Sequence, residues 1–452
     1  MRLLIFVFTL FLSTNIFANT LDVIRVGVVS VYKDATNITI RSDENIKIGY
    51  LQDNNFIELA RLDDNLINIS LVQQQYYTDN NSYATYNAAL NAANLTNGKV
   101  AYISPDNFLV YYTEINSSAV YPLDTYIEIS DSQNKVILIA NYNQIPLVFE
   151  GTDNDYAFPV MSAGENKYRG VLEVVQNDNG LTLVNTVGIE EYLFGVVPYE
   201  VSAYWPTEAL KAQAVVARSV ANFQSSRYLA YGYNIVDTTY AQVYKGVVGE
   251  DIRTTTAVLE TIGEVVIYND KIAETLYFAA SGGYTANAED VWGNAVPYLV
   301  AVPDIYETSP TVGEWQQDIS FQELESVLEE FNIGNLKQVK IVQISDNGRV
   351  TELQFVGDSG QHSVYNEATR TFFSRLESGS LKSQLYTFGE SSQQFTYDNT
   401  IDVQSSSDKE EMPMQQIFIL GIVDKDLSVI EGDEQKNIIE STDAEDAEQL
   451  TI

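Results

Sequence analysis

Residues 207–226 read TEALKAQAVVARSVANFQSS and carry the strongest helical signal in the chain. Pro206 precedes them, at a position where the first turn of a helix tolerates proline, and Glu208 places a negative charge at the positive end of the helix dipole. Alanine and valine then occur on nearly every face for about five turns, and a helix that is apolar all round is a buried one. We therefore expect a central buried helix over about 206–225.

Strand patterns lie on both sides of this helix. Apolar and polar positions alternate from residue 23 to about 62, and strand-like runs follow at 136–142, 147–151 and 181–187. Further runs of the same kind occur after residue 263. Such alternation is typical of strands with one covered face. The sequence therefore predicts an α+β fold, with a mixed β-sheet core around the buried helix.

Residues 70–118 follow a pattern of their own. SLVQQQYY (70–77) is strand-like, SYATYNAALNAANL (82–95) is helical, and KVAYIS (99–104) and FLVYYTEI (108–115) are strand-like again. This order predicts a small β-α-β-β module inserted into a larger domain at 19–69 and 119–388.

The two ends of the chain differ from the rest. Residues 1–18, MRLLIFVFTLFLSTNIFA, have the basic start, apolar stretch and final small residue of a secretory signal peptide. The apolar part is short for a membrane span, and an uncleaved anchor is the alternative. We expect an exported protein, secreted or associated with the cell wall. Residues 389–452 are predicted to be an acidic linker or tail, or an incomplete strand pair around IFILGIV.

The composition excludes several classes of chemistry. Of 452 residues, 62 are Asp or Glu and 25 are Lys or Arg, giving a formal net charge of -37, with no cysteine and one histidine. Phosphate backbones repel so acidic a chain, and we expect no nucleic-acid partner. The chain has no thiolate for a nucleophile or a metal site, and one histidine cannot build a histidine cage. We expect no cofactor and no metal.

Residues 189–219, IEEYLFGVVPYEVSAYWPTEALKAQAVVARS, resemble the family of stage II sporulation protein D and the LytB amidase enhancer. The family signature is an EEYL-GVVP-E turn followed by WP-EALKAQAVAAR. The similarity continues at YAQVYKG (240–246), at YFAASGGYTANAEDVWGNAVPYLVAVPD (277–304) and at LKSQLYTF (381–388), and it reaches back to IRVGVV (24–29) and YRGVLEV (168–174). It covers most of residues 23–388 apart from the insert.

The resemblance implies an activity and a catalytic residue. Family members with known activity are lytic transglycosylases that cleave peptidoglycan strands stripped of their stem peptides, between N-acetylmuramic acid and N-acetylglucosamine. Their catalytic acid is the Glu of the VVP-E turn, which is Glu200 here. A general acid must hold its proton near neutral pH, and apolar neighbours such as Val196 and Trp205 favour this. Without the resemblance, Glu200 is an ordinary solvated carboxylate.

Two polar residues of the predicted helix, Gln213 and Arg218, are further candidates for the site. Burying an unpaired polar group is costly, so both should form hydrogen bonds. Either they fix the catalytic turn, or they bond loop carbonyls and serve stability alone, which is the commoner role of buried polar groups. Glu190 and Glu191 are interpreted as surface or capping residues.

The segment Ser281, Gly282, Gly283 and Tyr284 follows a predicted strand. Its glycines permit the backbone to approach a ligand, and the family pattern retains this element beside the substrate groove. Sugar contact and a plain tight turn are equal alternatives.

The aromatic and imidazole side chains give weaker signals. Trp205 is a candidate for stacking on a sugar ring, although we expect at least two of the three tryptophans, Trp205, Trp292 and Trp315, to pack in the core. His362 lies in the polar stretch DSGQHS (358–363) and is interpreted as exposed.

Two departures from the family pattern bear on function. Relatives that bind zinc do so through Cys and His near a CQ-Y-G element, whereas this chain has YAQVY at 240–244, so no zinc site is expected. The glycine-rich GHGVGMSQ segment that helps line the groove has no counterpart, and we expect a chain that stops before it. Catalysis here would then depend on carboxylate chemistry, and the missing segment favours a non-catalytic role.

Two functions are therefore predicted side by side. The first is an exported lytic transglycosylase acting on denuded glycan strands, with a role in sporulation or cell-wall remodelling. The second is a non-catalytic, glycan-binding enhancer of a peptidoglycan amidase. The expected partners are denuded peptidoglycan strands and such an amidase.

The insert at 70–118 resembles, more weakly, a SPOR domain, a small fold that binds denuded glycan. Its tyrosines are candidates for a stacking surface, although half of them are equally suited to the core; they are Tyr76, Tyr77, Tyr83, Tyr102, Tyr111 and Tyr112. Fold alone does not establish glycan binding.

Overall fold

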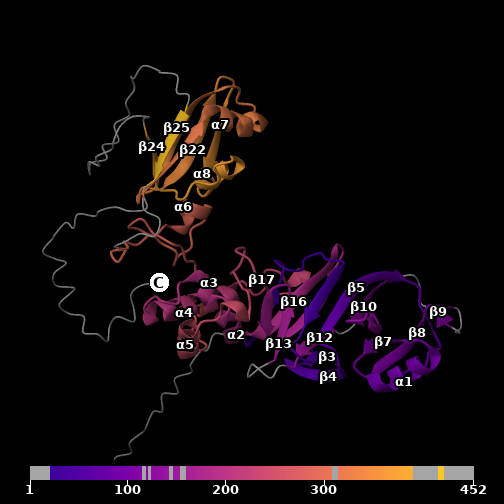
Figure 1. The fold of residues 1–452 in the computed structure, drawn as a ribbon. Helices are drawn as coiled ribbons and strands as arrows, with labels where there is room; N and C mark the ends of the chain where they lie inside the picture. Colours follow the sequence, from indigo (N-terminus) through magenta and orange to yellow (C-terminus); the bar gives the residue numbers. More distant parts are fainter. Residues whose placement is uncertain are drawn as a thin grey trace, which may run out of the picture. The chain divides into compact units, whose positions relative to one another are not determined.

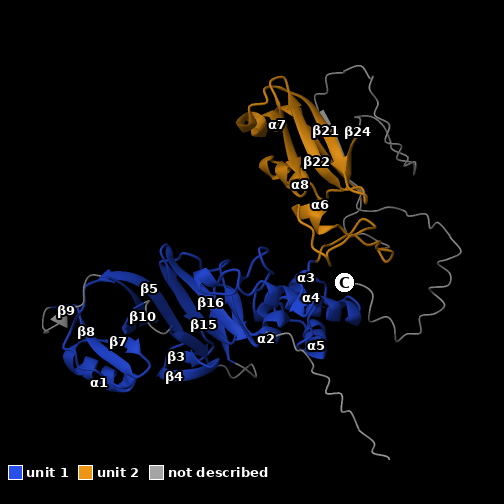
Figure 2. Ribbon diagram, turned by 180° about the vertical axis from the view of Figure 1, so that it is seen from behind, with its two compact units in different colours: residues 1–276, 452 blue, residues 277–451 orange. Residues whose placement is uncertain are grey.

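The computed structural model describes residues 21–114, 119–120, 124–141, 146–152, 159–307, 314–389 and 416–421 (Figure 1). The chain divides into two compact units, with the boundary after Leu276 (Figure 2). The predicted signal peptide at 1–18 lies outside the described residues. None of the described helices combines the length and the apolar character that crossing a membrane requires.

The first sheet of unit 1 has seven strands in the order β17-β1-β16-β15-β12-β3-β4. Its strands are β1 (Val23–Gly27), β3 (Ile46–Gln52), β4 (Asn55–Leu62), β12 (Val148–Gly151), β15 (Val171–Asn177), β16 (Gly180–Gly188) and β17 (Ile235–Val236). Strand β16 pairs antiparallel with both β15 and β1, and it is buried along almost its whole length. Its apolar residues Leu181, Leu183, Val184 and Val187 are buried, and so are its polar residues Thr182, Asn185 and Thr186. Strand β16 leads directly into the helices of the site.

The second sheet of unit 1 has ten strands in the order β14-β13-β2-β5-β10-β11-β7-β8-β6-β9. They are β2 (Asn37–Arg41), β5 (Leu66–Gln74), β6 (Tyr77–Thr78), β7 (Lys99–Ser104), β8 (Asn107–Tyr112), β9 (Ala119–Val120), β10 (Asp124–Asp131), β11 (Val136–Ala140), β13 (Val160–Ala163) and β14 (Asn166–Arg169). Helix α1 (Tyr86–Thr96) packs on β7 and β8 (Figure 1).

The predicted β-α-β-β order of the insert is confirmed, and its strands continue the ten-stranded sheet. Residue 70, its predicted start, falls inside β5, which pairs with β10 along its length. Strand β7 joins β11 in parallel, with Ala101 opposite Ile139. The insert therefore shares a sheet with the surrounding chain.

The helical part of unit 1 follows β16. It comprises α2 (Ile189–Phe194), α3 (Val197–Glu200), α4 (Thr207–Phe223), η1 (Leu229–Tyr231), η2 (Val247–Gly249) and α5 (Ile252–Glu260), followed by a hairpin of β18 (Ile267–Tyr268) and β19 (Lys271–Ile272). The predicted central helix is confirmed as α4, with Pro206 as its N-cap. Its burial is graded, because residues 216–222 are buried all round whereas Thr207 and Glu208 are exposed.

Unit 2 contains two three-stranded sheets, in the orders β20-β25-β24 and β21-β22-β23. Its elements are α6 (Ala288–Trp292), β20 (Trp315–Ser320), α7 (Phe321–Leu328), η3 (Glu329–Phe331), β21 (Leu336–Ile344), β22 (Val350–Gly357), β23 (Gln361–Tyr365), α8 (Ala368–Thr371), η4 (Phe372–Arg375), β24 (Tyr386–Gly389) and β25 (Gln416–Gly421). A capping box between Ser320 and Glu323 starts α7. Strand β25, from the segment predicted as an acidic tail or incomplete strand pair, lies between β20 and β24.

Candidate functional site

Glu200 is the last residue of α3, a single helical turn between α2 and α4. The side chain is half-buried, and its Oε1 accepts a hydrogen bond from the backbone N–H of Val243 at 3.3 Å. Val196 and Val197, which precede it in the turn, are fully buried. The predicted acid is therefore anchored by its turn on one side and by the 240–244 loop on the other.

The turn and the loop approach each other closely through two glycines. A Cβ atom on Gly195 would lie 2.7 Å from the carbonyl oxygen of Gly246, and one on Gly246, where φ is +63°, would lie 1.9 Å from that of Lys167. Side chains cannot fit at these backbone contacts, so glycine is required. Between them the fully buried Tyr244 donates a hydrogen bond to Asn185 Oδ1 at 2.7 Å. This contact ties the loop to β16.

Exposed aromatic side chains occur close to Glu200 in sequence and in the loop that bonds it. Tyr204 is 84% exposed, Tyr240 75% and Trp205 49%. The guanidinium of Arg253 forms a cation–π contact with the Tyr204 ring, and its Cζ lies 3.8 Å from the ring centroid. The exposure of Trp205 leaves its ring accessible, and its stacking on a sugar ring stays a prediction.

The expectation that at least two tryptophans pack in the core is wrong. Trp315 alone among the three is buried, and Trp205 and Trp292 are about half exposed. The reason is local: Trp205 stands just before the exposed first turn of α4, and Trp292 ends α6, in which Ala288 is the buried residue.

Arg218 is 1% exposed and forms a dense hydrogen-bond network inside unit 1. Its Nη2 lies 2.6 Å from Glu190 Oε2, and its Nε donates to both oxygens of the same carboxylate. It also donates to the carbonyl oxygens of Val258 and Glu264, at 3.2 and 3.0 Å. Glu190 in turn accepts from the N–H of Gly263. The network joins α2, α4, α5 and the following loop.

Both sequence-based interpretations of this pair need revision. Arg218 does bond loop carbonyls, as one alternative held, but its main partner is a carboxylate. Glu190 is half-buried, and from the first turn of α2 it supplies the acidic partner that a buried guanidinium requires.

Gln213 has no such partner for its amide nitrogen. Its Nε2 is buried and unbonded within the described part of the chain. Neither a bond to the catalytic turn nor one to a loop carbonyl is formed by this atom. A buried donor without a partner is uncommon and needs an explanation.

The predicted segment Ser281, Gly282, Gly283 and Tyr284 lies in unit 2 and forms a turn. Ser281 is buried, and Gly282 and Gly283 have φ values of +70° and +93°. The N–H groups of the first three residues point at one carboxylate oxygen of Glu307. The segment therefore forms a turn, and its contact with a sugar stays a prediction. The predicted residues are thus divided, with Glu200, Trp205, Gln213 and Arg218 in unit 1 and this turn in unit 2.

Residues 177–268 match the family model described as Stage II sporulation protein. Over this segment the chain is similar to the stage II sporulation protein D family. The segment contains β16, all of α2 to α5 and the predicted residues of unit 1. The turn at 281–284 lies beyond it.

Three relatives show how far the similarity extends. An uncharacterized protein of Brachyspira hyodysenteriae is 32% identical over 191 residues, which are 42% of this chain and 52% of that protein. The amidase enhancer of Bacillus subtilis is 38% identical over 134 residues, 30% of this chain and 18% of the relative. Stage II sporulation protein D of Bacillus subtilis is 36% identical over 162 residues, 30% of this chain and 47% of the relative. The chain thus matches about half the length of these relatives or less.

Two acidic residues in these contacts, Glu190 and Glu307, were not predicted from the sequence as hydrogen-bond partners. A signal existed for Glu190, since a buried arginine within a helix calls for a nearby acid and the preceding motif contains two. No signal existed for Glu307, which lies 26 positions from its hydrogen-bond partner Ser281.

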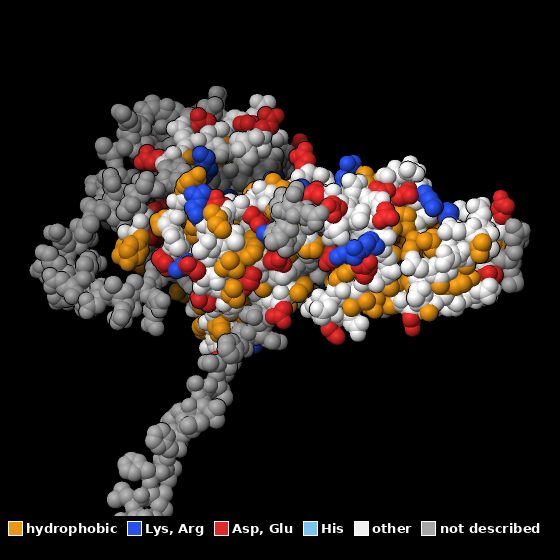
Figure 3. Space-filling view, turned by 60° about the horizontal axis from the view of Figure 1, so that its bottom comes forward, with side chains coloured by type: hydrophobic (Ala, Val, Ile, Leu, Met, Phe, Trp, Pro, Cys, Tyr) orange, Lys and Arg blue, Asp and Glu red, His pale blue; other side chains and the backbone are white. Residues whose placement is uncertain are grey.

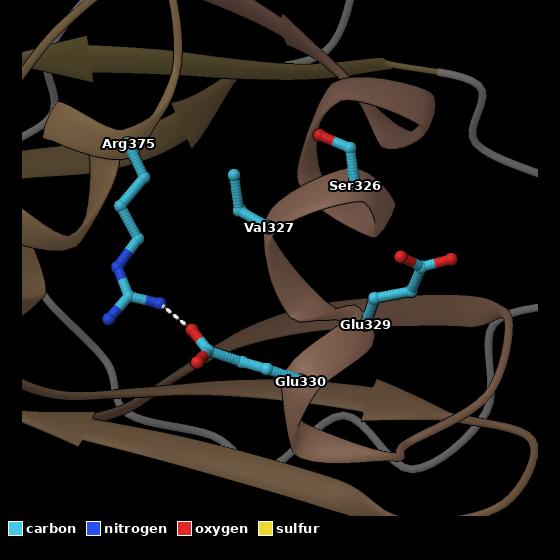
Figure 4. Close-up of a pocket in the computed structure, with 5 residues that line it drawn as sticks. All are labelled: Ser326, Val327, Glu329, Glu330 and Arg375. Atoms are coloured by element: carbon cyan, nitrogen blue, oxygen red, sulfur yellow. Dashed lines mark hydrogen bonds and ion pairs between the residues drawn. The ribbon is translucent and has the colours of Figure 1, made fainter.

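Unit 2 also has a surface hollow of about 660 Å³. Ser326 and Val327 of α7, Glu329 and Glu330 of η3 and Arg375 of η4 line it, and Arg375 forms an ion pair with Glu330 (Figure 4). None of the predicted site residues lines this hollow. Across the described residues, no group of three or more acidic, His or Cys side chains is arranged to hold a metal ion.

Proposed function

We propose that this protein is an exported lytic transglycosylase that cleaves denuded peptidoglycan strands between N-acetylmuramic acid and N-acetylglucosamine. The observation that carries the proposal is the half-buried Glu200, bonded to the Val243 N–H, inside the segment that matches the family. The names of the relatives support a place in sporulation or cell-wall remodelling outside the cytoplasm.

The chemistry requires one carboxyl group. Protonated Glu200 would donate its proton to the glycosidic oxygen as the bond to the leaving sugar breaks. As a carboxylate it would then accept the proton of the muramic acid C6 hydroxyl, whose oxygen attacks the anomeric carbon and closes a 1,6-anhydro ring. A hydrolase of the usual kind needs a second carboxylate at a set separation, and this reaction does not.

Stacking would supply much of the substrate affinity. Trp205, Tyr204 and Tyr240 present exposed rings beside α3 or on the loop that bonds Glu200. Aromatic faces bury the apolar faces of sugar rings, and tyrosine hydroxyls and the indole N–H bond sugar hydroxyls. Gln213 is a further candidate, because its amide nitrogen has no hydrogen-bond partner among the described residues.

The insert would add a second glycan-binding surface, but with fewer aromatic groups than its tyrosine content suggests. Tyr76, Tyr102 and Tyr111 are buried in the core. Tyr77, Tyr83 and Tyr112 are partly exposed and remain candidates for stacking. Binding of denuded glycan by a SPOR-like insert therefore rests on these three.

The test incubates the full chain with amidase-stripped glycan strands and analyses the products by mass spectrometry. We expect anhydro-muramic ends with the unaltered protein and at least about a hundredfold slower release with Glu200→Gln, the usual effect of removing a general acid. Glu208→Gln is the matched control, because it removes an exposed carboxyl group from the nearby first turn of α4. Equal release by Glu200→Gln would exclude the proposed mechanism.

The second candidate is a non-catalytic enhancer of a peptidoglycan amidase, favoured by the amidase enhancer of Bacillus subtilis among the relatives. Adding the protein to a purified amidase and intact peptidoglycan distinguishes the two functions. An enhancer raises the rate at which the amidase releases stem peptides, and it produces no anhydro ends. For an enhancer, the Glu200→Gln variant should raise the amidase rate as much as the unaltered protein does.

A further inference from the structure

The turn at Ser281–Gly283 presents four hydrogen-bond donors to a single carboxylate oxygen. Glu307 Oε2 accepts from the N–H groups of Ser281, Gly282 and Gly283 at 3.1, 2.8 and 3.3 Å, and from Ser281 Oγ at 2.5 Å. Successive backbone N–H groups that converge on one point form a nest for anions. The positive φ values of Gly282 and Gly283 permit this curvature.

A buried arginine holds the turn from the opposite side. Nη2 of Arg349 donates to the carbonyl oxygens of Ser281 and Tyr284, both at 2.9 Å, and the side chain is 8% exposed. With the carbonyl groups fixed toward the guanidinium, the N–H groups of the turn face away from it. The nest is therefore built before any anion binds, which lowers the cost of binding.

Glu307 reaches the nest through a short backbone ladder. The N–H of Thr285 donates to Val302 at 3.0 Å, and the N–H of Asp304 donates to Gly283 at 2.9 Å. Glu307 itself is only half-buried, as are Gly282 and Gly283. A carboxylate arriving from solvent would thus reach the donors once the Glu307 side chain swings out.

We propose that this nest is a binding site for the carboxylate of a ligand, and that Glu307 fills the position which the ligand would take. This inference rests on the proposed function, because the ligand it assigns is the lactyl carboxylate of N-acetylmuramic acid. That carboxylate is free where the stem peptide has been removed, and it is an uncharged amide where the peptide remains.

The nest would then select stripped strands. Hydrogen bonds to a charged acceptor are about twice as strong as those to a neutral one, so an amide binds the same donors more weakly. Exchange of Glu307 for the ligand replaces one carboxylate in the nest by another. Glu307 thereby acts as an internal competitor.

The test measures binding of muramyl oligosaccharides to the full chain by calorimetry, in a Glu200→Gln background that prevents cleavage. One oligosaccharide carries free lactyl carboxylates, and in the other these are converted to methylamides. We expect about tenfold tighter binding of the free acid. Glu307→Gln weakens the internal competitor and should strengthen binding of the acid several-fold. Glu289→Gln, an exposed acid of unit 2, is the matched control.

Equal affinity of the two oligosaccharides for the unaltered nest overturns the inference, and this comparison needs no substitution at Glu307. If the chain with Glu200 binds the acid selectively but forms no anhydro products, the nest is supported and the transglycosylase function is excluded. If the chain cleaves both oligosaccharides at equal rates, the transglycosylase function is supported and the nest is contradicted as the site that selects stripped strands.

Discussion

Gln213 lies on α4, and its amide nitrogen is buried without a partner among the described residues. Such an atom costs about 1–3 kcal/mol of stability. Gln213→Met keeps the side-chain length and the helix propensity and removes the donor. We expect the free energy of unfolding to rise by about 1 kcal/mol, measured by urea unfolding, while affinity for stripped glycan falls. Loss of stability instead would show that the amide is bonded in the folded protein.

His362 is the chain's single histidine, and it is half-buried rather than exposed as predicted from the sequence. Its ring stacks on Phe331, with centroids 3.7 Å apart. Burial, followed by the positive charge of Arg375, lowers the pKa of His362 below its usual value of 6.5. The imidazole of His362 therefore binds a proton more readily in the unfolded chain than in the folded one. As the pH falls below 6.5, protonation of His362 destabilises the folded state.

The titration is directly measurable because one histidine gives one set of imidazole NMR signals. We expect a midpoint below 6.5, together with a smaller loss of stability between neutral and mildly acidic pH in His362→Phe than in the unaltered protein. A midpoint at or above 6.5 would contradict the stacked, partly buried position.

At the scale of elements, the turn that carries Glu200 depends on contacts between segments that are distant in sequence. Helices α2, α4 and α5 meet at the Arg218–Glu190 pair, and α3 follows α2 directly. The 240–244 loop holds Glu200 through one N–H group and is itself fixed to β16 by Tyr244. The position of the acid is therefore set by how these helices pack.

Glu190→Gln tests the pair. It removes the counter-charge of a guanidinium that is 1% exposed, and breaking a buried pair in this way costs about 3 kcal/mol. The neighbouring Glu191→Gln, on the same helix, should cost far less. Urea unfolding of both variants gives the comparison, and equal losses would mean that the pair contributes nothing specific.

At the scale of the whole molecule, the net charge of -37 is spread widely. Figure 3 shows acidic side chains scattered over one face, with basic side chains singly or in small groups between them. Repulsion among like charges destabilises the compact state and is screened by salt. The screening length falls from about 30 Å near 0.01 M salt to about 8 Å near 0.15 M.

We therefore expect the midpoint of thermal unfolding to rise between about 0.01 and 0.15 M sodium chloride. Calorimetry at constant pH measures the shift, and sucrose at matched osmolality is the control for general solute effects. An unchanged or lower midpoint would show that favourable ion pairs offset the repulsion.

The sequence by itself determined the features that depend on neighbouring residues. The apolar period of residues 207–223 and the proline before them specify α4, and the motif ending at Glu200 lies in the segment that matches the family model. The order of elements in the insert follows from the same local patterns.

The tertiary structure alone decided which distant groups meet. Val243 bonds Glu200 across 43 positions, Arg218 finds Glu190 across 28, and Glu307 occupies the turn at Ser281 across 26. It also decided that the insert shares its sheet with β10 and β11, and that Trp205 and Trp292 stay exposed. Periodicity records which face of an element is covered, but the partner that covers it depends on the path of the whole chain.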